Sequence, residues 1–114
     1  MAESETVTPR DVVQQWLESA MVEGGVDAYY SKREHARYSW HQRLELMAGG
    51  EVFYVQARDI GEAGLGLICR QEFSVGEMVQ IRREANEPWV LARVVHATAT
   101  VGAFRTGFEL QFEC

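Results

Sequence analysis

Hydrophobic and polar residues follow two different periods along the chain, a helical one near its start and a strand-like one from about residue 42 onward. In "RDVVQQWLESAM", residues 10–21, apolar side chains recur at the spacing of one helix face. This stripe consists of Val12, Val13, Trp16, Leu17, Ala20 and Met21. Thr8 as N-cap and Pro9 at the first helical position predict the start of the helix, and Gly24–Gly25 predict its end.

From Gln42 onward, short runs of β-type residues alternate with turn residues. The runs are "HQRLELMA" (41–48), "EVFYVQAR" (51–58), "GLGLICR" (64–70), "EMVQIRRE" (77–84), "PWVLARVVHATAT" (88–100) and "AFRTGFELQF" (103–112). Gly49–Gly50 between the first two runs indicate a hairpin. Six short strands with tight turns predict a mainly β protein, a six-stranded antiparallel barrel preceded by an N-terminal α-helix.

The length and the charge distribution indicate a single-domain protein that neither spans a membrane nor carries a targeting signal. With 114 residues the chain forms one domain, and no apolar run approaches the roughly 20 residues that span a bilayer. The net charge of -6 is uneven: residues 1–31 hold six acids and one base (-5), and the remainder holds eleven acids and ten bases (-1). Because the first residues are acidic and polar, they match neither a secretory signal nor a transit peptide, and we expect a cytoplasmic protein.

One basic stretch stands out against this charge. "YYSKREHARYSW", residues 29–40, carries Lys32, Arg33 and Arg37 with a single glutamate. It is either a solvated loop or a place where something negatively charged binds. The chain therefore divides into an acidic N-terminal segment with an amphipathic helix (1–28) and a barrel domain (29–114) that includes a basic loop at 31–40.

Two short motifs carry the candidate chemistry. The first is RxxxR, formed by Arg33 and Arg37, and the second is "RDIGEAGLGL", in which Asp59 is followed by Gly61 and Gly64. Each motif alone is weak, since paired arginines occur by chance and Asp-x-Gly-x-x-Gly is typical of turns. Their order and their position before and within a small barrel make them informative together.

In that arrangement the chain resembles the PilZ family of bacterial cyclic diguanylate receptors. The family pattern is RxxxR in an N-terminal loop, then (D/N)xSxxG after a strand, then a Gly-x-x-Phe-like sequence mirrored here by "GFELQF"; the resemblance covers about residues 30–112. It implies a split-barrel fold, cyclic diguanylate as ligand, and ligand contacts from Arg33, Arg37, Asp59 and Gly64. Lys32 before the first arginine implies a stacked pair of nucleotides.

One position departs from the family pattern, because Gly61 replaces its serine. A neutral hydroxyl contributes about 0.5–1.5 kcal/mol, so its loss weakens binding without removing the charge-assisted arginine contacts. The chemistry otherwise agrees with the resemblance. Arginine forks onto phosphate oxygens or the O6/N7 edge of guanine, Asp59 accepts from guanine N1–H and N2–H, and Gly61 and Gly64 admit a flat ligand.

Signalling is expected to proceed by ordering of the loop around residues 31–38 on the ligand, which changes a surface used by a downstream protein. A homodimer through the N-terminal helix is the other expected partner, and membrane insertion is not expected. Two alternatives stay open. One is a degenerate PilZ domain acting only through protein contacts, and the other is a small-barrel module for single-stranded nucleic acid.

Catalysis, metals and cofactors find no support in the sequence. No nucleophile–base pair or phosphate-binding loop is recognisable, so no enzyme is expected. The two cysteines (Cys69, Cys114) and three histidines (His35, His41, His96) lack metal-ligand spacing, so no metal site and no cofactor are expected. Cys69 lies in an apolar run and is expected to be a buried, reduced thiol.

Overall fold

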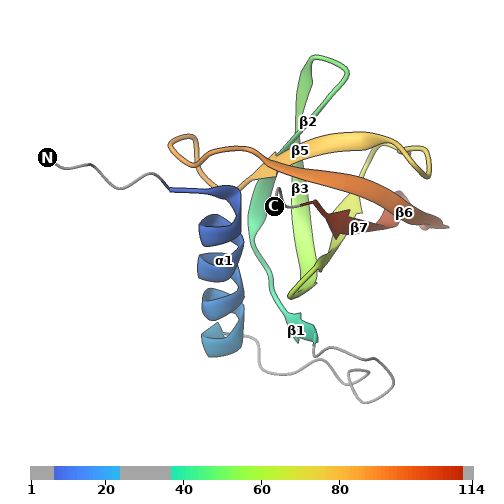
Figure 1. Cartoon of the computed structure of the whole chain (residues 1–114). Helices are drawn as coiled ribbons and strands as arrows, with labels where there is room; N and C mark the ends of the chain where they lie inside the picture. The colour runs from blue at the N-terminus through green and yellow to red at the C-terminus, as the bar shows by residue number, and fades with distance from the viewer. Residues whose placement is uncertain (1–6, 24–36, 112–114) are drawn as a thin grey trace, which may run out of the picture.

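A computed structural model describes residues 7–23 and 37–111 of the chain, which form one helix beside a small β-barrel (Figure 1). The elements are α1 (Pro9–Glu23), β1 (Arg37–Ser39), β2 (Arg43–Ala48), β3 (Glu51–Gly61), β4 (Gly64–Cys69), β5 (Met78–Arg82), β6 (Val90–Thr100) and β7 (Ala103–Leu110). All strand pairs are antiparallel. Lys32, Arg33, His35 and Cys114 lie outside the described residues.

Six strands close into a ring in the order β3-β2-β5-β6-β7-β4, and β4 pairs back with β3. This confirms the predicted six-stranded antiparallel barrel. Every predicted run corresponds to one of these strands, because alternating side chains along each run point into the barrel and out of it. The buried apolar side chains of the barrel strands are Leu44, Leu46, Ala48, Val55, Ala57, Ile60, Leu65, Leu67, Cys69, Val79, Ile81, Val90, Ala92, Val94, Phe108 and Leu110.

The hairpin between β2 and β3 is also confirmed. Ala48 pairs with Glu51, which leaves Gly49 and Gly50 as a two-residue loop with φ values of 60° and 83°. Two successive positive φ angles suit the right-handed twist of a hairpin, and glycine adopts them without steric cost.

The start of α1 has the expected cap, in a reciprocal form. The Thr8 hydroxyl accepts from the Asp11 amide at 3.2 Å, and the Asp11 carboxylate accepts from the Thr8 amide at 3.1 Å. Five residues of the predicted stripe are buried against the barrel, but Met21 is 49% exposed. At 100° per residue Met21 lies about 110° from the centre of the stripe, so its side chain falls outside the docked face.

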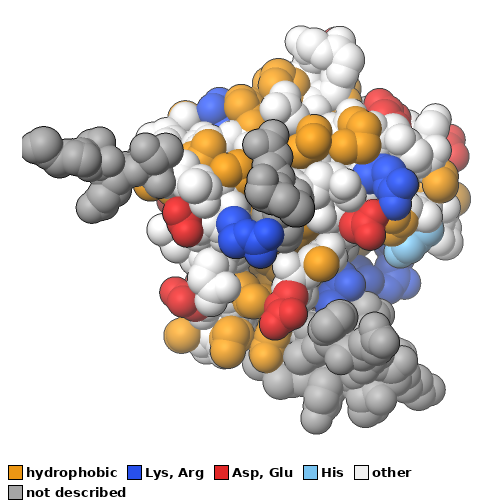
Figure 2. Space-filling view, in the orientation of Figure 1, with side chains coloured by type: hydrophobic (Ala, Val, Ile, Leu, Met, Phe, Trp, Pro, Cys, Tyr) orange, Lys and Arg blue, Asp and Glu red, His pale blue; other side chains and the backbone are white. Residues whose placement is uncertain are grey.

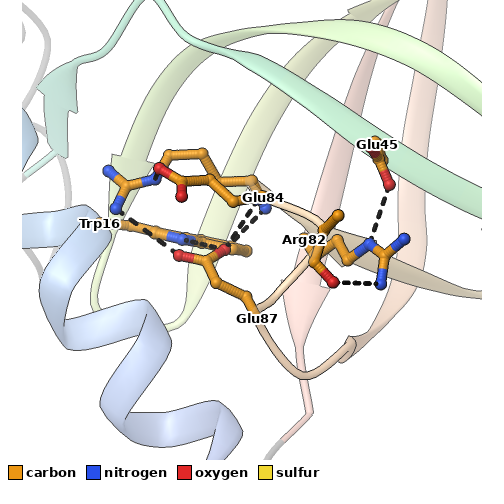
Figure 3. A network of polar contacts seen from close by, with 7 residues as sticks. Trp16, Glu45, Arg82, Glu84 and Glu87 are labelled. Atoms are coloured by element: carbon orange, nitrogen blue, oxygen red, sulfur yellow. Dashed lines mark hydrogen bonds and ion pairs between the residues drawn. The ribbon is translucent and has the colours of Figure 1, made fainter.

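Two tryptophans and one glutamate hold α1 against the barrel. Trp16 of α1 and Trp40, both fully buried, have ring centroids 5.7 Å apart. The Trp16 indole N–H donates to Glu87 at 3.3 Å, and the same Glu87 oxygen accepts from the backbone amides of Arg83 and Glu84 (Figure 3). The β5–β6 turn is therefore built around one carboxylate that also binds the helix.

An additional short strand lies inside the predicted loop 31–40. Residues 37–39 form β1 and pair with the end of β3, with Arg37 opposite Gly61 and Ser39 opposite Asp59. β3 extends past its predicted end at residue 58 to Gly61, and this extension supplies the backbone groups that β1 pairs with. Two candidate binding motifs are thereby hydrogen-bonded to each other.

Candidate functional site

A row of four residues crosses four neighbouring strands at one end of the barrel. Asp59 on β3 pairs with Gly66 on β4, Gly66 pairs with Gly107 on β7, and Gly107 pairs with His96 on β6. The two central positions lack side chains, so the row forms a floor of bare backbone between a carboxylate and an imidazole.

Each end of this row follows a β-bulge. The β3–β4 register shifts between Ala57 and Asp59, and the β6–β7 register shifts between Val94 and His96. An extra residue in one strand turns the following side chain relative to its neighbours, which is why bulges often lie beside binding sites. Here the two bulges place Asp59 and His96 at the glycine floor.

Asp59 is held by two arginines. Its side chain is 1% exposed, Oδ1 accepts from Arg37 Nη2 at 2.7 Å, and Oδ2 lies 3.4 Å from Arg58 Nη2. The guanidinium groups offset the cost of burying the carboxylate charge. Within the described part of the chain, however, Oδ2 has no hydrogen-bond partner, and neither have Arg37 Nε and Arg58 Nε. Asp59 therefore has ion-pair partners in Arg37 and Arg58, but several hydrogen-bonding atoms of these three side chains have no partner among the described residues.

The glycines of β4 allow these side chains to lie on the strand. A Cβ at Gly64 would approach Arg37 Nη1 to 2.8 Å, and a Cβ at Gly66 would overlap the Asp59 carboxylate. Any larger residue would therefore displace Arg37 or Asp59. The close approach of side chains, rather than a positive φ angle, explains glycine at both positions.

An open cleft of about 490 Å³ lies over this floor. It is lined by Arg37, Arg58, Asp59, Leu65, Gly66, Val95, His96, Thr98, Arg105, Thr106, Gly107 and Phe108. Three arginines against one aspartate make the lining cationic, and the size lies within the usual range for small-molecule sites. The arginines of the cleft can donate hydrogen bonds to an anion or to neutral acceptor atoms of a ligand, and Asp59 can accept hydrogen bonds from the ligand.

The structure brings together four of the six residues predicted to bind the ligand. Arg37 contacts Asp59, Gly61 pairs with Arg37 across β1–β3, and Gly64 lies under the Arg37 guanidinium. Lys32 and Arg33 fall in the segment that the structure does not describe.

Sequence reasoning missed part of the cleft: Arg58, Gly66, His96, Thr98, Arg105 and Gly107. Arg58 and Gly66 lie within "RDIGEAGLGL" and Gly107 lies within "GFELQF", but the family pattern implies no ligand contact for them. His96 and Arg105 carry no local signal. Only the β6–β7 register places them beside the glycines.

Among the described residues, no three His, Cys, Asp or Glu side chains are grouped closely enough to hold a metal ion. The same portion of the chain contains no helix with the length and apolarity needed to cross a bilayer. Cys69 is buried, as expected, and burial raises the pKa of its thiol to about 11.

Comparisons with known proteins agree with this architecture. The family model described as "PilZ domain" matches residues 31–113. A solved structure, that of the Bacillus subtilis inhibitor of motility (MotI/DgrA), matches with a TM-score of 0.57 and 13% sequence identity, covering 72% of this chain and 44% of that one. The likeness at this identity concerns the fold alone, and this chain spans less than half of that protein. No curated protein sequence matches the chain.

Proposed function

The chain belongs to the PilZ domain family, and from that premise we propose that it is a non-enzymatic, cytoplasmic receptor for cyclic diguanylate. PilZ domains are nucleotide-binding receptors, and the cleft has the chemistry that this ligand requires. Cyclic diguanylate carries phosphodiester charges, guanine N1–H and N2–H donors, and O6/N7 acceptors. The cleft meets them with three arginines and one carboxylate.

The incomplete hydrogen bonding of Asp59 is the observation that carries this proposal. Arg37 occupies Oδ1, while Oδ2 is buried without a hydrogen-bond partner in the described structure. A buried acceptor left unpaired costs about 1–3 kcal/mol, and a guanine edge would remove that cost. Arg58 lies 3.4 Å from Oδ2 and is partly exposed, so we propose that it turns toward a phosphate when guanine arrives.

Arg37 then has two roles. It fixes the Asp59 carboxylate through Oδ1. We propose that its guanidinium also donates to the ligand, since Arg37 lines the cleft and its Nε has no partner among the described residues. Arg33, outside the described residues, is proposed to contact the ligand from the same loop. Lys32 before it favours a stacked pair of nucleotides, and calorimetry giving one nucleotide per chain would contradict that stoichiometry.

Gly61 sets the expected strength of binding. It pairs with Arg37 at the position where the family pattern has serine. The missing hydroxyl corresponds to roughly 2- to 12-fold in affinity, whereas charge-assisted arginine bonds contribute about 1.5–3 kcal/mol each. We therefore propose weakened but retained binding, and not a domain that has lost its ligand.

A short path connects the ligand loop to α1. Arg37 begins β1, Trp40 directly follows that strand, and Trp40 packs on Trp16 of the helix. Because residues 37 and 38 already pair with β3, we propose that ligand binding orders the part of the loop 31–38 that precedes β1. The β1–Trp40–Trp16 path then passes the change to α1 and to a downstream protein or a second copy of the chain. Hydrogen exchange of residues 31–38 that is the same with and without nucleotide would contradict this mechanism.

Single-stranded nucleic acid is a less suitable ligand. A general binder needs a continuous basic groove with exposed aromatic platforms. On the face seen in Figure 2, basic side chains form small groups among acidic and apolar ones and no continuous groove. Trp40 is fully buried, and Trp89 is covered by the Arg82 guanidinium 4.1 Å from its ring centroid.

Calorimetric titration of the full chain with cyclic diguanylate, and separately with a single-stranded oligonucleotide, tests the proposal. We expect saturable binding of the cyclic dinucleotide that is lost in Arg33→Ala and Arg37→Ala. Arg70→Ala is the matched control, because Arg70 is exposed and does not line the cleft. Binding of the oligonucleotide alone would support the nucleic-acid alternative, and binding of neither would support a domain that acts only through protein contacts.

A further inference from the structure

The cleft has a second rim, opposite Asp59, that no motif predicted. His96 and Thr98 lie on β6, where His96 pairs with Gly107 and Thr98 pairs with Arg105 of β7. Alternate residues of a strand share a face, so these side chains stand on the same side of the β6–β7 hairpin, and all three line the cleft.

Arg105 differs from most of the described arginines. Arg82, Arg83 and Arg93 each pair with a glutamate, and Arg37 and Arg58 pair with Asp59. Among the described residues, no carboxylate pairs with Arg105, and Asp59 is the only acid that lines the cleft. The rim therefore carries a cation that no carboxylate of the described residues neutralises.

His96 reaches the floor only because residue 107 is glycine. A Cβ at Gly107 would overlap the imidazole, with Nε2 as the nearest ring atom. The bulge between Val94 and His96 brings the ring to this place. A glycine and a bulge thus combine to put an imidazole nitrogen at the floor of the cleft. A histidine on a regular strand without these two features would not be held in this position.

We infer that His96, Thr98 and Arg105 form a phosphate-binding rim that takes a phosphodiester group of the cyclic dinucleotide. This inference rests on the proposed function. A forked guanidinium, a hydroxyl and an imidazole N–H are all donors suited to phosphate oxygens, and the three lie together without a carboxylate.

The two rims meet over the paired glycines of β4 and β7. The Asp59 carboxylate lies over Gly66 and the His96 ring lies over Gly107, and Gly66 and Gly107 pair with each other. Because Cβ positions of such a pair are about 4.5–5.5 Å apart, the two side chains can contact neighbouring groups of one nucleotide, with Thr98 and Arg105 farther along the β6–β7 hairpin. Asp59 recognises the base, while the His96–Arg105 rim recognises the charge.

Calorimetry on the full chain tests the rim, with Arg105→Gln and His96→Ala as variants and Arg70→Gln as control. Arg70 is likewise exposed and without an ion-pair partner in the described residues, but lies outside this cleft. Loss of a charge-assisted phosphate contact is expected to weaken cyclic diguanylate binding by about tenfold to a hundredfold in Arg105→Gln. Arg70→Gln is expected to bind as the unaltered chain does.

The outcomes separate the rim from the proposed function. If Arg37→Ala loses binding while Arg105→Gln and His96→Ala keep it, the rim is overturned and the receptor function stands. If the unaltered chain does not bind the nucleotide, both are overturned.

A second readout does not depend on affinity. The imidazole NMR signals of His96 are expected to shift on titration with cyclic diguanylate, while those of His41, which is exposed outside the cleft, stay unchanged. A saturated complex in which the His96 signals do not move would contradict the rim.

Discussion

Asp59 and His96 stand at opposite ends of one row of paired residues, with Gly66 and Gly107 between them. Both follow a bulge in their strand, and both side chains reach over a glycine that leaves room for them. The two paired glycines thus make room for an acceptor, Asp59, and a donor, His96, which approach each other from opposite sides of the cleft. This relationship accounts for the cleft between β3 and β6.

Gly66→Ala is expected to abolish or greatly weaken nucleotide binding while the barrel remains folded. The added methyl would overlap the Asp59 carboxylate and lie 3.7 Å from Arg58 Nη2, so it would displace the acceptor. Calorimetry measures the affinity, and thermal unfolding of the same sample checks the fold. Unchanged affinity in a folded variant would show that Asp59 does not bind the ligand from its present position.

Gly61→Ser is expected to strengthen binding by roughly 2- to 12-fold, because it restores one neutral hydrogen bond. Gly61 is paired with Arg37 in the β1–β3 register, so the new hydroxyl lies beside the arginine that holds Asp59. Titrations of this variant and the unaltered chain, run side by side, give the ratio. Equal or weaker binding would mean that a serine hydroxyl at residue 61 makes no hydrogen bond to the ligand.

Trp16→Ala is expected to lower the free energy of unfolding by about 3–5 kcal/mol, since it removes a fully buried ring that packs on Trp40. Trp16→Phe is the matched control. It keeps most of the packing and costs about 1 kcal/mol for the lost indole hydrogen bond, because Glu87 Oε1 retains its two backbone donors. Chemical denaturation measures both values. A negligible cost for alanine would contradict docking of α1 on the barrel in solution.

The Cys69 thiol is expected to react slowly in the native protein. Burial raises its pKa from 9.0 to about 11. At pH 8 the thiolate fraction is therefore about a hundredfold below that of an unfolded chain. A Cys114→Ser variant leaves Cys69 as the sole cysteine, and a colorimetric thiol reagent then measures the rate with and without denaturant. Equal rates would contradict a buried thiol.

The same shift has a consequence for stability at high pH. The folded-state pKa of Cys69 lies above its unfolded value, so the contribution of the neutral thiol is fully present below about pH 9. It is lost as pH rises toward and through about 11, because the unfolded state releases its proton first. Cys69→Ala is expected to flatten this part of the pH–stability profile. A profile with the same slope in both proteins would exclude Cys69 as a cause.

The fold was predictable from local signals. Thr8, Pro9 and Asp11 form the cap that starts α1, and Gly49–Gly50 form the hairpin loop. Alternating apolar residues predicted the strands of the ring, because a half-buried strand requires that alternation. The short strand β1 was missed because it depends on pairing with β3, which is distant in the sequence. Met21 was wrongly included in the buried stripe, although its angle on the helix already places it outside the docked face.

Only part of the candidate site was predictable. Arg37 and Asp59 belong to a two-part motif, and the structure joins them by a hydrogen bond at 2.7 Å. His96 and Arg105 were missed because their place depends on the β4–β7 and β6–β7 registers and on a bulge. A one-residue shift moves every later side chain to the other face of a strand, and the sequence alone does not show where that shift occurs.

The most direct test of the account is an isothermal titration of the full chain with cyclic diguanylate, beside Arg37→Ala and the exposed control Arg70→Ala. The account predicts saturable binding by the unaltered chain and by Arg70→Ala, and loss of at least tenfold in affinity for Arg37→Ala, which removes a charge-assisted contact. Absence of binding by the unaltered chain, or equal binding by Arg37→Ala, would contradict it.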